Sequence, residues 1–481
     1  MIAQLGAKLR RWRLRAAVQR SALFDGAWYL RRYPDLLPGC DAALHYLANG
    51  AAEGRDPGPE FSTSGYVLQC QEAGLAIGTD NPLLHYHRVG AAQGMAGCPS
   101  FAGQPAPPGC PVILFVGHQA QRRLFGAERS LLHMLERATA AGLCVEVVLP
   151  QVLNADYLAQ LRARAHRIHL RPFGWRHGHQ PAEAAAVAAL MALIVQSGAV
   201  ELHQNTVALD APLLAARRLG IPAVLHLREL PAEDPELCAR LALTASELRM
   251  RLLAEADRFV ANSVAVARWI APPETARCLV LPNSIDAELF TLPFQPQTPL
   301  RVGLISSNVA KKGLSDMLRV AQLWADLPSG SASGYGPVVF RLIGPPSADL
   351  AALSPLPESV QAIGYFASPV QALAELDVVL SLSHFAESFG RTVYEALAAG
   401  RPVICYDRGT PPALVGVSGA GGAGLVVPAD DPAAVVQALL WLTATPGRLL
   451  AASDAARRRG QDIRGQAAQI GDRMLYAAAF P

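Results

Sequence analysis

Lysine is almost absent from this chain of 481 residues. Only Lys8, Lys311 and Lys312 occur, so nearly all of the 42 basic residues are arginines. Basic and acidic residues almost balance, and the formal net charge is only +3 at pH 7. A charge this small gives no bulk electrostatic attraction to nucleic acid, and we expect no nucleic-acid partner.

Paired cysteines and long apolar runs are also missing. The eight cysteines are scattered, without a CxxC pair or a spacing typical of zinc sites, which favours free thiols in a reducing cytoplasm. The longest apolar stretch, residues 184–195, is too short to span a bilayer. Basic residues interrupt the first fifteen positions, which do not resemble a secretory leader. We therefore expect a cytoplasmic protein, and its 51% of hydrophobic residues is enough for large cores.

The most informative segment, residues 381–400, contains two glutamates eight residues apart. The apolar run 376–382 that leads into it predicts a buried parallel strand. The alanine-rich stretch before Gly400 predicts the end of a helix. Glu387 is therefore expected in the loop at the carboxyl end of a strand, and Glu395 within the next helix. Open α/β sheets bind ligands at this edge, and the first helical turn offers backbone N–H groups to a phosphate.

Two of the three lysines stand side by side, as Lys311 and Lys312, directly before Gly313. They follow a predicted strand at 300–305 and precede a predicted helix. A compact ammonium beside a glycine turn is a good point-charge ligand for phosphate. The alternative interpretation is a solvated pair of surface lysines.

The glutamate segment resembles the donor-site signature of the retaining glycosyltransferases of group 1 (family 4), which have the two-Rossmann GT-B fold. The family pattern is Glu, seven residues, Glu, with Phe389 and Gly390 after the first glutamate. The resemblance covers residues 111–470. It implies transfer of a sugar from a nucleotide-diphosphate sugar to a hydroxyl of a glycan or lipid-linked glycan, with retention of anomeric configuration and without a metal or other cofactor. The implied setting is bacterial surface polysaccharide or glycolipid synthesis, peripheral on the inner face of the membrane.

The resemblance also implies residue roles. Glu387 would hold hydroxyls of the transferred sugar, Lys312 would stabilise the departing diphosphate, and Glu395 would bind the ribose hydroxyls. His226, at the end of the predicted strand 223–227, would reach the transferred sugar or the acceptor; the alternative is a satisfied core histidine. The other implied donor-binding positions are Ser388, Phe389, Gly390, Arg391, Thr392, Lys311 and Gly126.

The chain departs from the family pattern at two places. Ser306 and Ser307 stand where the family often has a phosphate-binding arginine, so either Arg391 or Lys311 compensates or the phosphate is held more weakly. Pro412 and Ala413 stand where a glutamate is common. These departures keep a second hypothesis open, a non-catalytic nucleotide-sugar-binding or assembly subunit of a polysaccharide synthesis complex. Arg228 and Glu229, after the strand that ends near His226, either form an ion pair or bind acceptor.

The first twenty residues predict a basic amphipathic helix. Ile2, Leu5, Leu9, Trp12 and Ala16 follow one another at steps of three and four, with arginines between them. Such a helix can lie on an anionic membrane surface, or it can pack on the next domain.

Residues 21–102 contain a repeat. A phenylalanine, a tyrosine, a His-Tyr pair and a Gly-Ala-Ala-x-Gly run recur at steps of 37 to 40 residues, around His45-Tyr46 and His85-Tyr86, and a third copy is predicted to begin at Phe101. The repeats resemble a small helical module found beside bacterial polysaccharide glycosyltransferases. We interpret the His-Tyr pairs as core aromatics rather than metal ligands.

The predicted fold class is α/β, with two Rossmann-like parallel-sheet domains facing a cleft and a helical repeat module before them. The predicted boundaries are 1–20 for the basic helix, 21–102 for the repeat module, 103–110 for a Pro/Gly linker, 111–296 for the acceptor domain, 297–460 for the nucleotide-sugar donor domain, and 461–481 for a helix crossing back to the first Rossmann-like domain.

Overall fold

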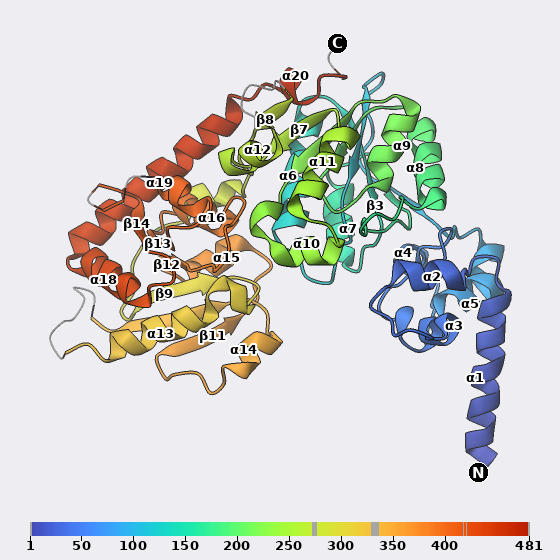
Figure 1. Cartoon of the computed structure of the whole chain (residues 1–481), viewed down its shortest axis with the longest axis horizontal. Helices are drawn as coiled ribbons and strands as arrows, with labels where there is room; N and C mark the ends of the chain where they lie inside the picture. The colour runs from blue at the N-terminus through green and yellow to red at the C-terminus, as the bar shows by residue number, and fades with distance from the viewer. Residues whose placement is uncertain (1, 272–276, 329–335, 417, 420, 480–481) are drawn as a thin grey trace. The chain divides into compact units, whose positions relative to one another are not determined.

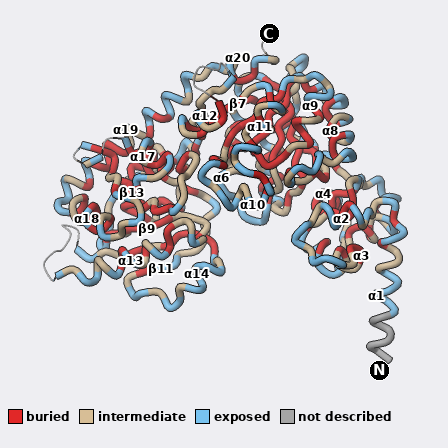
Figure 2. The backbone as a smooth tube through the Cα atoms, in the orientation of Figure 1, coloured by how far each residue is buried: buried red, intermediate tan, exposed pale blue. Residues whose placement is uncertain are grey.

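The computed structural model describes residues 2–271, 277–328, 336–416, 418–419 and 421–479, with side chains from residue 9 onward. The chain forms two compact units (Figure 1). The first comprises Met1–His226, Ala239–Phe259 and Asp472–Pro481, and the second comprises Leu227–Cys238 and Val260–Gly471. Buried positions concentrate along the strands of both sheets (Figure 2).

One sheet has eight strands in the order β1-β4-β3-β2-β5-β6-β7-β8. The strands are β1 (Ser100–Ala102), β2 (Val112–Val116), β3 (Cys144–Leu149), β4 (Arg167–Leu170), β5 (Ala199–Gln204), β6 (Ala223–Leu227), β7 (Arg258–Ala261) and β8 (Cys278–Val280). From β4 to β7 this is the 3-2-1-4-5-6 order of a doubly wound Rossmann fold. β2 pairs in parallel with both β3 and β5, and β1 pairs antiparallel with β4.

The second sheet has six strands in the order β11-β10-β9-β12-β13-β14, which is again the 3-2-1-4-5-6 order. The strands are β9 (Leu300–Ile305), β10 (Val338–Ile343), β11 (Val360–Gly364), β12 (Val378–Ser381), β13 (Val403–Tyr406) and β14 (Gly424–Val427). All its neighbouring strands pair in parallel. The two doubly wound parallel sheets predicted from the sequence are therefore confirmed.

Side chains along the strands of the second sheet alternate between its two faces, and each face carries its own hydrophobic core. Leu380 and Ile404 pack in a cluster with residues of α13 (Leu314–Ala325) and α18 (Pro432–Thr443). Val379 and Val403 pack in another, with residues of α15 (Pro369–Ala374) and α16 (Arg391–Ala398). Because successive strand side chains point to opposite faces, this division gives three layers, helix on sheet on helix.

The remaining helices surround the sheets. They are α6 (Gly126–Ala140), α7 (Ala155–Arg162), α8 (Ala184–Ser197), α9 (Ala211–Leu219), α10 (Pro235–Leu241), α11 (Ala245–Glu255), α12 (Val264–Ile270), α14 (Ala348–Ala352), α17 (Pro411–Val415), α19 (Pro446–Ala468) and α20 (Asp472–Leu475). Asp472 belongs to the first unit, where its carboxylate accepts a hydrogen bond from Arg137 at 3.0 Å. No single described helix is long and apolar enough to cross a membrane, although α18 and α19, bent by 103°, meet that test as a pair.

The repeats form a small helical module with its own aromatic core. Its helices are α1 (Ile2–Arg20), α2 (Gly26–Arg32), α3 (Ala42–His45), α4 (Thr63–Glu72) and α5 (Pro82–His85), with π-helical turns at Tyr46–Gly50 and Tyr86–Gly90. The hydroxyl of Tyr29 shares a hydrogen bond with His45 at 2.9 Å, and that of Tyr66 shares one with His85 at 2.6 Å. The two copies thus use their histidines in the same way, although His85 is buried and His45 is only partly buried.

A glycine in each copy makes room for this contact. A Cβ atom at Gly50 would lie 2.1 Å from the Tyr29 hydroxyl, and one at Gly90 would lie 2.2 Å from the Tyr66 hydroxyl. The repeated glycine is therefore a packing requirement of the Tyr–His pair.

One sequence interpretation in the first unit is wrong, and one strand has no counterpart in the sequence analysis. Phe101 does not begin a third repeat, because it lies in β1 and pairs with Ile168 of β4. The strand β4 was not predicted, because Arg167 and His169 interrupt its apolar pattern. His169 is nevertheless buried and forms a hydrogen bond with Glu146 of β3 at 2.9 Å.

Candidate active site

The switch point of the second sheet lies between β9 and β12, where the strand order reverses. Ligands of doubly wound sheets bind at the carboxyl ends of the strands beside such a point. The segment after β9 carries Lys311 and Lys312, and the segment after β12 carries Glu387. Both predicted motifs therefore stand at the edge of the sheet where a ligand is expected.

Lys312 and Glu387 form a direct pair across the two segments. The Lys312 ammonium donates a hydrogen bond to Glu387 Oε1 at 2.7 Å, and the Ser383 hydroxyl donates to the same oxygen at 2.5 Å. Burial alone would raise the pKa of Glu387, but the charge of Lys312 and these two hydrogen bonds outweigh it, so the pKa lies below its usual value. Glu387 is thus ionised at neutral pH and acts as a hydrogen-bond acceptor.

Gly313 allows the two segments to approach each other. Its φ is +81°, and a Cβ atom there would lie 2.2 Å from the carbonyl oxygen of Leu382 at the end of the β12 segment. Any side chain would force the segments apart and lengthen the Lys312–Glu387 pair.

Lys311 is engaged with different carboxylates. Its ammonium lies 2.7 Å from Glu236 Oε2 and 3.8 Å from Asp234 Oδ1. The ring of Phe385 lies beneath both lysines, with centroid distances of 5.0 Å to Lys311 and 4.7 Å to Lys312, which adds a cation–π attraction. Lys311 would therefore have to leave these carboxylates to bind a phosphate.

Glu395 is almost fully buried in α16, with an exposed fraction of 5%. Arg391, one turn earlier, donates a hydrogen bond from Nε to Glu395 Oε1 at 2.8 Å. Gly390 is the N-cap residue of α16, with a φ of +84° and no side chain of its own to cap the helix start. The partial positive charge of the helix start, from Arg391 and Thr392 on, thus stands beside the loop that carries Glu387.

Ser388 and Phe389 are used to position this loop. The Ser388 hydroxyl donates to the carbonyl oxygen of Arg228 at 2.6 Å, and the Ser263 hydroxyl donates to the carbonyl oxygen of Ser388 at 2.6 Å. Phe389, 3% exposed, packs edge-on against Tyr394 with centroids 5.9 Å apart. The Phe389 side chain belongs to the core, so this position offers a ligand only its backbone.

Arg228 brings a further cation to the signature segment. Its Nη1 donates to Asn283 Oδ1 at 2.5 Å. Burial lowers the pKa of Arg228 to about 10, the charge of Glu229 opposes this shift, and the charge of Arg391 adds to it. The repulsion between the guanidinium groups of Arg228 and Arg391 would be relieved by an anion bound near both.

The other two predicted site residues belong to the first unit. Gly126 is the first residue of α6. His226, 1% exposed, ends β6 and shares a hydrogen bond with His203 Nδ1 at 2.9 Å. His203 in turn lies 3.5 Å from Glu201, which pairs with Arg258. His226 is thus held in the core of its own unit, and its contact with a substrate stays a prediction.

One group of potential metal ligands was missed in the sequence. Oxygen and nitrogen atoms of Asp316, His384 and Asp430 lie within 4.8 Å of one another. The group already has partners, because the Tyr406 hydroxyl donates to Asp316 at 2.5 Å and Arg408 forms an ion pair with Asp430. These contacts supply positive charge and protons where a metal would bind, so the group does not favour a cation.

Comparison with protein families matches both parts of the chain. Residues 125–284 match the model described as a glycosyl transferase 4-like domain, and residues 300–445 match the model described as glycosyl transferases group 1. The two ranges together span more than half of the chain, and the second contains Lys312, Glu387 and Glu395. The chain belongs to the group 1 glycosyltransferases. No curated protein matches this glycosyltransferase in a sequence comparison.

Solved structures share the fold of this glycosyltransferase at low sequence identity. HepE from Anabaena, in complex with UDP-glucose, matches with 20% identity and a TM-score of 0.55, over 74% of this chain and 98% of HepE. Sucrose-phosphate synthase from Thermosynechococcus elongatus matches with 18% identity and a TM-score of 0.55, over 77% and 100%. A TarM variant of S. aureus matches with 12% identity and a TM-score of 0.59, over 77% and 100%. These likenesses establish the predicted GT-B fold.

Several residues of the glycosyltransferase site were not assigned from its sequence. Ser383 and Phe385 lie inside the signature segment, residues 381–400. A hydroxyl and an aromatic ring so close to Glu387 in the sequence were the signals that could have identified them. Asp234 and Glu236 are about 75 residues away from their partner Lys311, and no local pattern links them.

Proposed function

We propose that this glycosyltransferase moves a sugar from a nucleotide-diphosphate sugar to a hydroxyl of a glycan or lipid-linked glycan, with retention of anomeric configuration, in the synthesis of a bacterial surface polysaccharide or glycolipid. The observation that carries this proposal is the Lys312–Glu387 pair beside the start of α16, at the switch point of the second sheet. The HepE structure in complex with UDP-glucose, and the TarM structure in complex with UDP, alpha-GlcNAc-glycerol and Fondaparinux, support this choice of donor and acceptor class.

Each charged residue has a part in holding the donor. Glu395 accepts hydrogen bonds from the two ribose hydroxyls, because a carboxylate offers two acceptor oxygens to a vicinal diol. Each such bond contributes on the order of 1.5–3 kcal/mol. Glu387, ionised through its contact with Lys312, accepts hydrogen bonds from hydroxyls of the transferred sugar.

The reaction breaks the bond between the anomeric carbon and the diphosphate oxygen, and forms a bond from that carbon to the acceptor oxygen on the same face. The proton of the acceptor hydroxyl passes to the departing phosphate oxygen. The electron pair of the broken bond stays on the diphosphate oxygen, so negative charge grows there in the transition state, and Lys312 with the first amides of α16 stabilises it. Arg228 and Arg391, which repel each other without an anion, take the part of the arginine that Ser306 and Ser307 replace.

Binding of the donor nucleotide is tested by thermal unfolding with UDP, GDP, dTDP, ADP and CMP, each with and without excess EDTA. We expect one nucleotide to raise Tm, because a ligand at ~100 times its Kd stabilises the native state by about 2.7 kcal/mol. We expect the shift to survive EDTA, because the proposed phosphate ligands are cationic side chains and amides. A folded protein that responds to none of these nucleotides would overturn the donor proposal and favour the non-catalytic assembly subunit.

Retention is tested on the product of the transfer. With an α-linked donor we expect an α-linked product, recognised by the coupling constant of its anomeric proton in NMR spectra recorded during the reaction. A β-linked first product would contradict the retaining mechanism without affecting the assignment of the donor site. Free sugar as the main product would instead contradict transfer to a hydroxyl acceptor.

A further inference from the structure

The helix α1 exposes apolar and basic side chains together. Leu9 is 50% exposed and Trp12 is 61% exposed, and the arginines at positions 10, 11, 13 and 20 are exposed as well. Covering these neighbouring apolar side chains with a partner would remove apolar area from water, which is favourable.

The helix is attached to the repeat module by its carboxyl-terminal part. Val18 is fully buried in the module core, and Arg15 pairs with Asp41 at 2.5 Å. Val18 follows Leu9 by nine residues, which is two and a half turns, so the two side chains leave opposite faces of the helix. The Leu9–Trp12 face therefore points away from the face that packs in the module.

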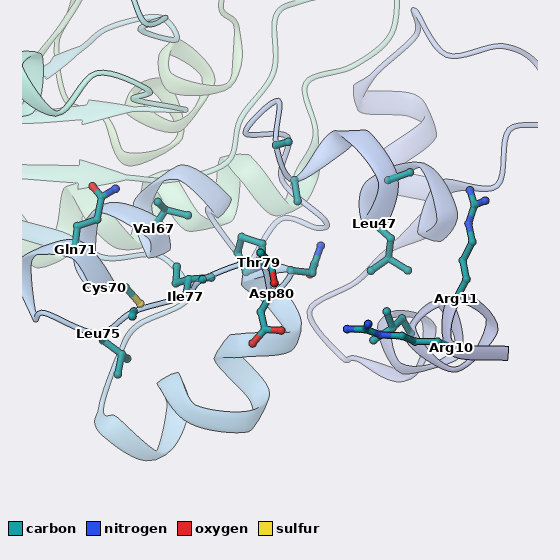
Figure 3. A pocket seen from close by; sticks show the side chains of 18 of the residues that line it. Arg10, Arg11, Leu47, Val67, Cys70, Gln71, Leu75, Ile77, Thr79 and Asp80 are labelled. Carbon is teal, nitrogen blue, oxygen red and sulfur yellow. The ribbon is translucent and has the colours of Figure 1, made fainter. Parts of the chain in front are cut away.

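The module side of residues 10–14 is not packed either. Arg10, Arg11 and Leu14 line one wall of a cleft of about 840 Å³, and Leu47, Leu75 and Ile77 lie among the residues lining the rest (Figure 3). Residues 9–14 thus lack the close packing that normally stabilises a helix in water. A surface that accepts their apolar side chains would supply it.

The charge of α1 identifies the kind of surface. The first twenty residues contain six basic residues and no acidic residue, in a chain whose net charge is only +3. Basic side chains beside exposed Trp and Leu match the boundary of an anionic bilayer, where arginine binds the headgroup phosphates and the apolar groups enter the acyl region. We propose that α1 docks the protein on a membrane surface that contains anionic phospholipid, through the one helix face that carries Leu9, Trp12, Arg13 and Arg20.

Sedimentation of the full chain with lipid vesicles tests this docking. We expect binding to vesicles of phosphatidylglycerol mixed with phosphatidylcholine, weakened by salt, and little binding to phosphatidylcholine alone. Each basic residue near an anionic surface contributes roughly a factor of five to affinity, so the variant Arg13→Glu/Arg20→Glu should bind at least about twentyfold more weakly. Trp12→Ala should weaken binding several-fold without any change of charge.

Two matched controls separate docking from general charge and hydrophobicity. Arg218→Glu/Arg268→Glu changes two exposed arginines elsewhere by the same charge, and Met250→Ala removes another exposed apolar side chain. Both should bind vesicles like the unchanged protein, and all variants should keep its Tm. Equal binding to both vesicle types, or equal loss in the control arginine variant, would overturn the proposal. Tight binding to soluble heparin that Trp12→Ala leaves unchanged would also overturn the proposal. The partner of α1 would then be an acidic polymer rather than a membrane.

Discussion

Replacing Lys312 by alanine is expected to lower kcat for sugar transfer at least tenfold. Its ammonium stands at the switch point, 2.7 Å from Glu387 and beside the start of α16. Removal of one group that stabilises charge in a transition state typically costs about 10²–10³ in kcat. The loss should appear more in kcat than in the donor KM, because charge on the diphosphate grows as the bond breaks.

A second consequence of Lys312→Ala follows from the pair itself. Glu387 would lose the cation that keeps its pKa low, while its burial, which raises the pKa, would remain. The carboxylate would then be a poorer acceptor for sugar hydroxyls near neutral pH. We therefore expect the remaining activity to rise with pH over a range where the activity of the unchanged enzyme is flat.

The neighbouring lysine provides a matched control. Lys311→Ala removes the same side chain one residue earlier, but that ammonium is paired with Glu236 and Asp234. We expect its transfer rate to stay within about threefold of the unchanged enzyme, the range of an exposed ion pair. A normal rate for Lys312→Ala together with a low rate for Lys311→Ala would reverse the assignment of the phosphate ligand. Normal rates for both would move it to Arg391 or Arg228.

Local sequence patterns predicted those parts of the site that depend on local structure. The mostly apolar run at 376–382 predicted β12, because a strand covered on both faces is apolar at nearly every position. The alanines before Gly400 predicted the end of α16, and Gly400 indeed has a φ of +68°. The positions of Glu387 in a loop and Glu395 in a helix followed from these two elements.

Contacts that depend on the order of strands in the sheet could not be predicted from such patterns. Lys312 and Glu387 are 75 residues apart and meet only because β12 lies beside β9 in the sheet. Ser388 reaches the carbonyl oxygen of Arg228 across 160 residues. Phe101 fits the repeat by residue type, but its pairing with Ile168 places it in a strand. In each case the residue that makes the contact is distant in the sequence, and no local periodicity of the sequence predicts the contact.

Replacing Glu395 by alanine is expected to abolish the rise in Tm that the donor nucleotide produces. The buried carboxylate is the proposed acceptor for both ribose hydroxyls, and two charge-assisted hydrogen bonds together contribute roughly 3–6 kcal/mol. Nucleotide affinity should therefore fall at least a hundredfold, as measured by isothermal titration calorimetry. Glu395→Gln should lose less, because it keeps one acceptor oxygen and the same volume.

Comparing nucleotides with nucleosides separates Glu395 from Lys312. Glu395→Ala should weaken binding of the nucleoside and of its diphosphate by the same factor, because it acts on the ribose. Lys312→Ala should weaken only the diphosphate. Arg391 Nε lies 2.8 Å from Glu395 Oε1. If Glu395→Ala weakened binding of the diphosphate alone, Glu395 would act by positioning Arg391 for the phosphates rather than by binding ribose.

Glu375 supplies the matched control for the loss of a paired glutamate. It forms an ion pair with Arg341 at 2.5 Å in the same unit, but it precedes β12, whereas the site lies beyond the carboxyl end of that strand. Glu375→Ala should leave nucleotide binding unchanged. Unchanged nucleotide affinity in Glu395→Ala would refute the ribose role, and the donor would then have to be held by the phosphate ligands alone.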